Sequence, residues 1–184
     1  AKFDSAKTTP ENRKHWANAD GLSPNAAINP EVRRVLRNRA RYEVANNSYA
    51  KGIVLTLAND TIGTGPRLQM LTDDADANAR IEDAFEQWSR AVDLPGKLRT
   101  MRLARAESGE AFALLINNPG IASAGSPVSL DLKLIEADQV CTPLLRRGRN
   151  DEIDGIALDQ WGNPSAYRVL KRHPGDSGVF RTPF

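Results

Sequence analysis

The chain has 184 residues, 40% of them hydrophobic and 26% charged, with a formal net charge of +2 and one cysteine. This length allows about one domain with one sizeable core, and no apolar run approaches the ~20 residues of a membrane-spanning helix. The single cysteine, Cys141, excludes an intrachain disulfide and a multi-cysteine zinc site, and the N-terminus lacks the layout of a signal peptide. We therefore expect a globular, cytosolic protein with no membrane partner.

The chain begins with a segment that we expect to be an extended arm, residues 1–29, because proline and glycine recur there without helical or strand periodicity. A helix is predicted directly after it. Asn29 suits the capping position, Pro30 the first helical position, and Glu31 the first turn, where the helix dipole favours a negative charge. The predicted domain therefore spans residues 30–175.

A second helix is predicted to follow, because Asn46 and Asn47 favour helix ends over helix interiors. Its apolar residues recur at intervals of three and four, which is typical of a buried helical face: Ala50, Ile53, Val54, Leu57 and Ala58. Gly63 and Gly65 are expected to end this helix, and residues 67–71 alternate in the manner of a short strand.

Two further helices are predicted over residues 74–92 and 97–108, separated by a break at "DLPGK". The first carries an apolar stripe: Ile81, Phe85, Trp88 and Val92. The second is predicted to bury Leu98 and Met101 and to stop at Gly109.

The rest of the chain is predicted to form short strands, in "EAFALLIN", "PVSLDLKLIEADQV", "DEIDGIALD" and "SAYRVLK". The last two flank a hairpin with Gly162-Asn163 at its tip, where positive φ is expected. Helices first and strands later predict an α+β fold with a mostly antiparallel sheet. Residues 176–184 are interpreted as the tail of a truncated chain.

Several local patterns suggest chemistry, but none of them forms a coherent site. Gly63-Thr64-Gly65 lacks the rest of a phosphate-binding motif and is interpreted as a helix stop. His15 and His173 have no neighbouring metal-ligand partners, and Glu107 and Glu110 are interpreted as surface charges. We therefore predict no catalytic, metal or cofactor site.

The arginine stripe of the first helix, Arg33, Arg34, Arg37 and Arg41, is the most prominent feature left unexplained. These four side chains lie within about a quarter of the helix circumference, and a later helix is also basic, through Lys97, Arg99, Arg102 and Arg105. Three interpretations stay open for these faces: a solvated surface, a contact with another subunit, and a contact with DNA phosphates.

The order of several segments resembles the N-terminal half of phage portal proteins of the lambda family. The segments are "HWANADGLSPNAA", "RRVLRNRARYEVANNSYAKGIVLTLANDTIGTGPRLQML", "ARAESGEAFALL", "IEADQV" and "DGIALDQWGNPSAYRVL". The resemblance runs over nearly the whole chain, and residues 41–65 are its most telling part. It implies the α+β wing region of a longer protein.

The resemblance also implies a structural role in a ring, usually a dodecamer, at one capsid vertex. Such a ring conducts double-stranded DNA and docks the terminase large subunit, capsid or scaffold protein, and head-tail connector proteins. The implied location is the virion, and the host cytoplasm during assembly or when the protein is prophage-encoded. For this chain alone we expect a monomer or weak oligomer, and we expect the arginine stripe to face a neighbouring subunit before DNA.

Two other functions remain open. One is an autonomous DNA-binding adaptor that uses both basic helices, for which a steep dependence of DNA affinity on salt is expected. The other is a hydrolase organised around Cys141 or around Ser177 in "GDSG", which requires a histidine close to one of these nucleophiles.

Overall fold

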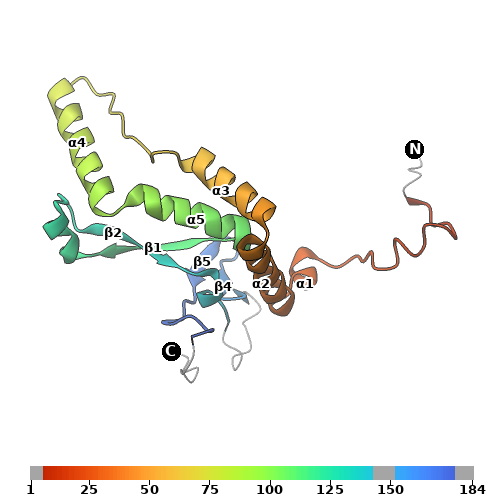
Figure 1. Ribbon diagram of the computed structural model, residues 1–184. Coiled ribbons are helices and arrows are strands. Elements are labelled where there is room, and N and C mark those ends of the chain that lie inside the picture. The colour runs from red at the N-terminus through yellow and green to blue at the C-terminus, as the bar shows by residue number, and fades with distance from the viewer. Residues whose placement is uncertain (1–5, 143–151, 177–184) are drawn as a thin grey trace.

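The computed structural model describes residues 6–142 and 152–176. Helices come first and strands later, which confirms the predicted α+β class. Figure 1 shows the small sheets beneath α5, with residues 6–23 reaching away from them. The helices are α1 (Pro24–Ala27), α2 (Pro30–Asn46), α3 (Ser48–Ile62), α4 (Ala75–Ala91) and α5 (Leu94–Ser108). The strands are β1 (Phe112–Asn117), β2 (Leu130–Ile135), β3 (Glu152–Ile153), β4 (Ile156–Leu158) and β5 (Pro164–Tyr167).

Asparagine caps define the first two long helices, as the sequence predicts. The side chain of Asn29 accepts hydrogen bonds from the backbone N–H groups of Glu31 and Val32, with Pro30 in the first turn. Asn47 ends α2 and also caps α3, because its side chain accepts from Tyr49 and Ala50 while its backbone is extended. A single residue therefore separates the two helices.

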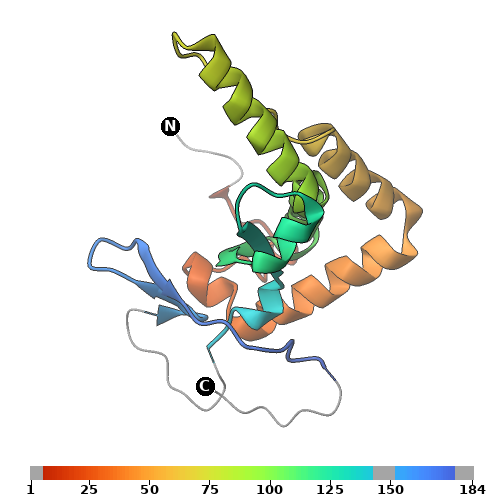
Figure 2. The same cartoon turned by 90° about the vertical axis from the view of Figure 1, so that its left-hand side faces the viewer.

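The break between α4 and α5 is shorter than expected, since α5 begins at Leu94 and not at Lys97. Asp93 adopts a left-handed backbone with φ 50°, and its side chain caps the N–H of Gly96. Pro95 lies in the first turn, where its missing N–H needs no partner, so it begins the helix and does not break it. Figure 1 shows α5 turning away from the lower end of α4, with α3 beside α5, and Figure 2 shows α4 projecting from the rest of the protein.

The strand predicted over residues 67–71 is wrong. This segment has no regular structure, and the N–H of Met70 donates to the side chain of Glu82 at 2.7 Å, so α4 satisfies a group that a strand would pair. The strand predicted over residues 127–140 is also too long. It ends at Ile135, because Glu136 and Gln139 form a reciprocal capping box that starts the short 3-10 helix η3 (Ala137–Gln139).

The strands form two small sheets where one was expected, and every pair among the described residues is antiparallel. One sheet is β1 with β2, and the other has the order β3-β4-β5. A turn at Asp154 and Gly155, both with positive φ, divides the strand predicted over residues 151–159 into β3 and β4. The hairpin between β4 and β5 is confirmed, with φ 83° at Gly162, while Asn163 does not have the positive φ expected of it.

The core is small and lies where α4, α5 and β2 meet. Val92, Leu94 and Ile121 are buried, and partly buried apolar side chains pack around them: Phe85, Trp88, Leu98 and Leu132. The indole N–H of Trp88 donates to the carbonyl of Leu130 at 2.6 Å. Most of the predicted α4 stripe therefore enters the core. Ile81, at its N-terminal end, stays 45% exposed.

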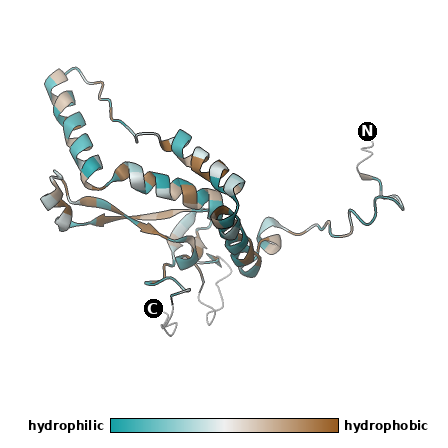
Figure 3. Cartoon of the chain, viewed as in Figure 1, coloured by the Kyte–Doolittle hydropathy of each residue, from teal (hydrophilic) through white to brown (hydrophobic). Residues whose placement is uncertain are grey.

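Helix α3 buries only part of its predicted apolar face. Val54 and Ala58 are buried, but Ile53 is 63% exposed and Tyr49 is 84% exposed. Figure 3 shows hydrophobic residues recurring along this helix. With Leu57, the exposed residues recur every fourth position and so form one stripe along α3. In the described part of the chain, no helix combines the length and the apolar character needed to cross a membrane.

Candidate subunit interface

Most of the arginine stripe of α2 faces the body of the protein. Arg37 is buried, at 7% exposure, and Arg33 and Arg41 are partly buried. Arg34 is exposed and pairs with Glu31 within the same helix. Three of the four arginines are thus turned inward, opposite to the orientation of an ordinary amphipathic helix.

Each inward arginine meets a carboxylate from a distant part of the chain. Arg37 contacts Glu110 at 2.7 Å and Asp138 at 2.9 Å through its two terminal nitrogens. Arg41 contacts the other oxygen of Asp138 at 2.7 Å, and Arg33 contacts Asp154 at 2.9 Å. These partners lie before β1, in η3 and in the β3–β4 turn, so α2 joins three separate elements through charge.

The two carboxylates that share Arg37 respond oppositely to their surroundings. Burial acts to raise the pKa of Asp138, but hydrogen bonds from Arg37 and Arg41 outweigh it and leave that pKa below its ordinary value. Burial raises the pKa of Glu110, and the nearby charges of Arg37 and Arg33 only partly offset it. Asp138 is therefore the better-stabilised anion of the network.

His173 lies at the edge of this network. Its Nε2 is 3.5 Å from a carboxylate oxygen of Glu136 and of Asp138, and these three residues have the proximity of metal ligands. Its Nδ1, however, accepts the N–H of Gly175 at 3.0 Å, so the proton of the neutral ring lies on Nε2, the atom that faces the carboxylates. Since two arginines already neutralise Asp138, the cluster fits a hydrogen-bonded charge network better than a metal site.

The basic residues of α5 have a different environment. Lys97 contacts Asp131 at 2.5 Å. Arg99 donates to the Asn59 side chain at 2.9 Å and Arg102 to the Thr61 hydroxyl at 3.4 Å, which are both neutral partners. Within residues 6–142 and 152–176, neither of them forms an ion pair, and neither does Arg105. The structure therefore leaves α5 with uncompensated positive charge.

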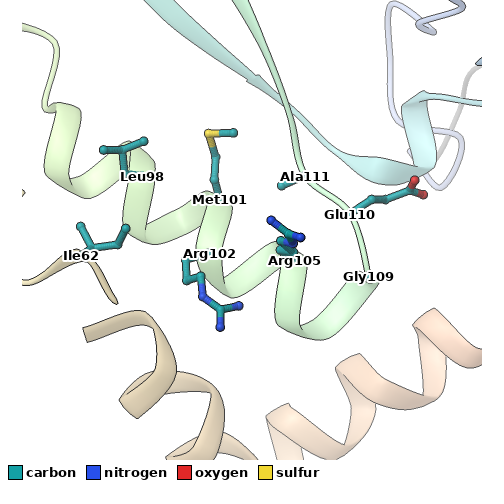
Figure 4. A pocket seen from close by; sticks show the side chains of 8 residues that line it. All are labelled: Ile62, Leu98, Met101, Arg102, Arg105, Gly109, Glu110 and Ala111. Carbon is teal, nitrogen blue, oxygen red and sulfur yellow. The ribbon is translucent and has the colours of Figure 1, made fainter. Parts of the chain in front are cut away.

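An open pocket of about 410 Å³ lies beside these arginines. It is lined by the end of α3, by α5 and by the residues that lead into β1, as Figure 4 shows: Ile62, Leu98, Met101, Arg102, Arg105, Gly109, Glu110 and Ala111. The lining combines apolar side chains with two guanidinium groups. Such a surface can receive an apolar side chain that carries negative charge beside it.

Among the described residues, the other positions singled out by the sequence are not part of the lining of this pocket. Cys141 is half-buried, and its backbone packs against Gly155, where a Cβ would approach within 2.7 Å. Gly63-Thr64-Gly65 ends α3 as expected, with the N–H of Gly63 bonded to the carbonyl of Asn59. Ser177 is outside the described residues, so the interpretation of "GDSG" stays a prediction.

Sequence reasoning missed the acidic partners of α2. Glu110 is not the surface charge that was expected, since it is half-buried against Arg37. Asp138 and Asp154 carry no local signal of this role, because 101 and 121 residues separate them from their arginines. The one usable hint was the high density of arginine on one face of α2, which a fold must either expose or neutralise.

A sparsely buried α+β fold with exposed apolar side chains and free arginines is typical of proteins that act through contacts with other molecules. A model of the family described as "Phage portal protein, lambda family" matches residues 10–182. The chain therefore belongs to the lambda family of phage portal proteins, as its segment order suggested. It is also 29% identical, over 160 residues, to a probable portal protein of Halomonas phage phiHAP-1. That alignment covers 77% of this chain and 30% of the relative, so the chain spans under a third of that protein.

Proposed function

We propose that this chain is part of a structural subunit of a phage portal ring, with copies side by side at one capsid vertex. In this role it acts by presenting surfaces and carries out no bond-making step. Double-stranded DNA passes through the ring channel during packaging and ejection. The terminase large subunit, capsid or scaffold protein and head-tail connector proteins dock on the ring. The protein is a virion component that assembles in the host cytoplasm.

The observation that carries this proposal is the apolar surface that the described part of the chain leaves uncovered. Tyr49, Ile53 and Leu57 form an exposed stripe along α3. Monomeric proteins rarely leave a contiguous apolar patch in contact with water. Neighbouring subunits would cover such area.

Electron microscopy of the purified full-length protein, with sedimentation velocity, tests the proposal. Rings with a central channel are expected. Protein that stays monomeric at every concentration and salt tested would contradict the role. As a sharper variant, Ile53→Asp places a charge at the centre of the α3 stripe and is expected to weaken assembly. Lys51→Asp, at an exposed position of the same helix, is the matched control.

A second function, DNA binding by the chain itself, is favoured by one observation. Arg99, Arg102 and Arg105 have no carboxylate partner in the described part of the chain and so are free to contact phosphates. Three such contacts predict a slope of about −3 in the logarithm of affinity against the logarithm of salt. Failure to bind duplex DNA at low salt would rule this function out.

A further inference from the structure

The α5 pocket is lined by apolar side chains and by two arginines, which we call its basic rim. Ile62, Leu98 and Met101 supply the apolar atoms, while Arg102 and Arg105 supply the charge. Figure 4 shows these side chains along one stretch of α5, with Ile62 at one end and Glu110 at the other.

The carboxylate of Glu110 does not neutralise this rim, because it is already paired with Arg37 at 2.7 Å. Arg102 uses only its Nε, toward the neutral hydroxyl of Thr61, so its terminal nitrogens remain able to donate. Arg105 is exposed. The chemistry of the pocket therefore selects an apolar side chain with carboxylates next to it.

The connection between α3 and α4 carries such a group on its surface. Leu71 is 86% exposed, and the carboxylates that follow it are also exposed: Asp73, Asp74 and Asp76. None of these three forms an ion pair with a described residue. The sequence "LTDDAD" thus presents one large apolar side chain and three negative charges within six residues.

This acidic tip, residues 71–76, is held in place on both sides of Leu71. The N–H of Met70 donates to Glu82 at 2.7 Å, and the side chain of Asn78 donates to the carbonyl of Thr72 at 2.9 Å. Asp74 caps α4 through the N–H of Ala77. Because the backbone is fixed before any contact forms, little conformational entropy is lost when Leu71 is covered.

We propose that the acidic tip of one copy docks into the α5 pocket of the next copy, with Leu71 against Met101 and the aspartates against Arg102 and Arg105. In the structure Leu71 is exposed and does not line the pocket of its own chain. A contact between two different patches of identical subunits is head-to-tail, and repetition about an axis closes such contacts into a ring. The inference rests on the proposed portal role and names the surfaces that join the subunits.

Charge reversal in the full-length protein tests this contact. Arg102→Glu with Arg105→Glu is expected to abolish rings in sedimentation velocity and electron microscopy, and so is Asp73→Arg with Asp76→Arg. Combining all four substitutions restores opposite charges and is expected to restore the rings. The matched control is Arg13→Glu with Arg39→Glu, two exposed arginines outside both the pocket and the acidic tip, which is expected to leave assembly unchanged. Circular dichroism checks that each variant is folded. Rings in both reversed variants would overturn the proposal, and so would a combined variant that stays unassembled.

Disulfide trapping gives a second, positive readout. In a Cys141→Ser background, Leu71→Cys with Met101→Cys is expected to give a ladder of covalent multimers under oxidation, while each single cysteine gives no ladder. Rings without a ladder, together with intact assembly after charge reversal, would overturn this contact and leave the portal role standing. Absence of any assembly by the unsubstituted protein would overturn the portal role and this contact together.

Discussion

Helices α2 and α5 are both rich in basic residues, but the fold gives their charges opposite environments. Arg33, Arg37 and Arg41 of α2 meet carboxylates of the same chain at 2.7–2.9 Å. Arg99 and Arg102 of α5 meet only neutral oxygens. Basic composition therefore does not decide whether a helix binds a partner. The deciding factor is whether the fold itself supplies carboxylates to the basic residues. A buried guanidinium must form an ion pair within the chain, whereas an exposed one can stay unpaired and contact another molecule.

The largest expected effect is on the buried member of the α2 network. Arg37→Ala leaves Glu110 and Asp138 without their shared partner and is expected to lower the free energy of unfolding by about 3–5 kcal/mol, measured by urea denaturation. Arg34→Ala removes an exposed charge from the same helix and is the control, with an expected loss below about 0.5 kcal/mol. Equal losses would mean that α2 is not held by buried charge.

The α2 network is also expected to make the stability of the protein depend on pH, through Asp138. Its folded pKa lies below the unfolded value of about 3.9, so its contribution to stability is complete above that value and is lost as the pH falls through the folded pKa. Asp138→Asn is expected to lower the free energy of unfolding by about 2 kcal/mol at pH 7 and to flatten the stability profile below pH 4. Urea denaturation between pH 2 and 7 measures both effects.

Glu110 is the matched control for Asp138, because its pKa shifts in the opposite direction. Its pKa is raised, so its contribution to stability is present below the unfolded value of about 4.3 and is lost as the pH rises through the folded pKa. Glu110→Gln is therefore expected to cost less than Asp138→Asn at pH 7, about 1 kcal/mol or less. A larger loss for Glu110→Gln would reverse the assignment of Asp138 as the main anion.

Lys97 is the member of the α5 set that behaves like the α2 arginines, since it pairs with the buried Asp131. Lys97→Met is expected to lower the free energy of unfolding by about 1–2 kcal/mol. The loss stays moderate because Asp131 keeps hydrogen bonds from the Asn118 side chain and the Leu132 N–H. Thermal and urea unfolding measure this loss of stability. A loss as large as that of Arg37→Ala would contradict the claim that the charges of α2 contribute more to stability than those of α5.

The smallest effect on stability is expected at the free α5 arginines. Arg99→Ala, Arg102→Ala and Arg105→Ala should each change the free energy of unfolding by less than about 0.5 kcal/mol. The change should appear instead in sedimentation velocity of the full-length protein, as weaker assembly for the Arg102 and Arg105 variants. A loss of stability above about 1.5 kcal/mol would mean that these side chains hold the fold together.

The helix boundaries could largely be predicted from the sequence, because the signals that set them are local. Asn29, Asn47 and Asp74 cap the helices that they precede, and Gly109 ends α5. The break between β3 and β4 was missed although its signal is local, because Asp154-Gly155 is an Asp-Gly pair, which is typical of a two-residue hairpin turn, and both residues have positive φ. The division of the strands into two sheets could not be predicted, because it depends on pairing between separate segments of the chain.

For the candidate interface, the sequence predicted which residues share a helix face, but not which of these faces is buried. Periodicity identified the arginine face of α2 and the apolar face of α3, but not which of them turns inward. Arg37 is buried because Glu110 and Asp138 arrive from distant segments, and Ile53 is exposed although its spacing is that of a core residue. Spacing reports which residues share a helix face, and the tertiary fold alone decides what that face meets.

The junction at Asn47 has a consequence for how contacts on α3 reach the rest of the molecule. Asn47 is both the C-cap of α2 and the N-cap of α3, so no flexible linker separates the two helices. We therefore expect a movement of one helix to be transmitted to the other. A neighbour pressed against Tyr49 or Ile53 therefore also restrains α2, and through its arginines the turn at Asp154. Amide hydrogen exchange is therefore expected to slow in the β3–β4 hairpin when α3 is covered, although the two regions are far apart in the sequence.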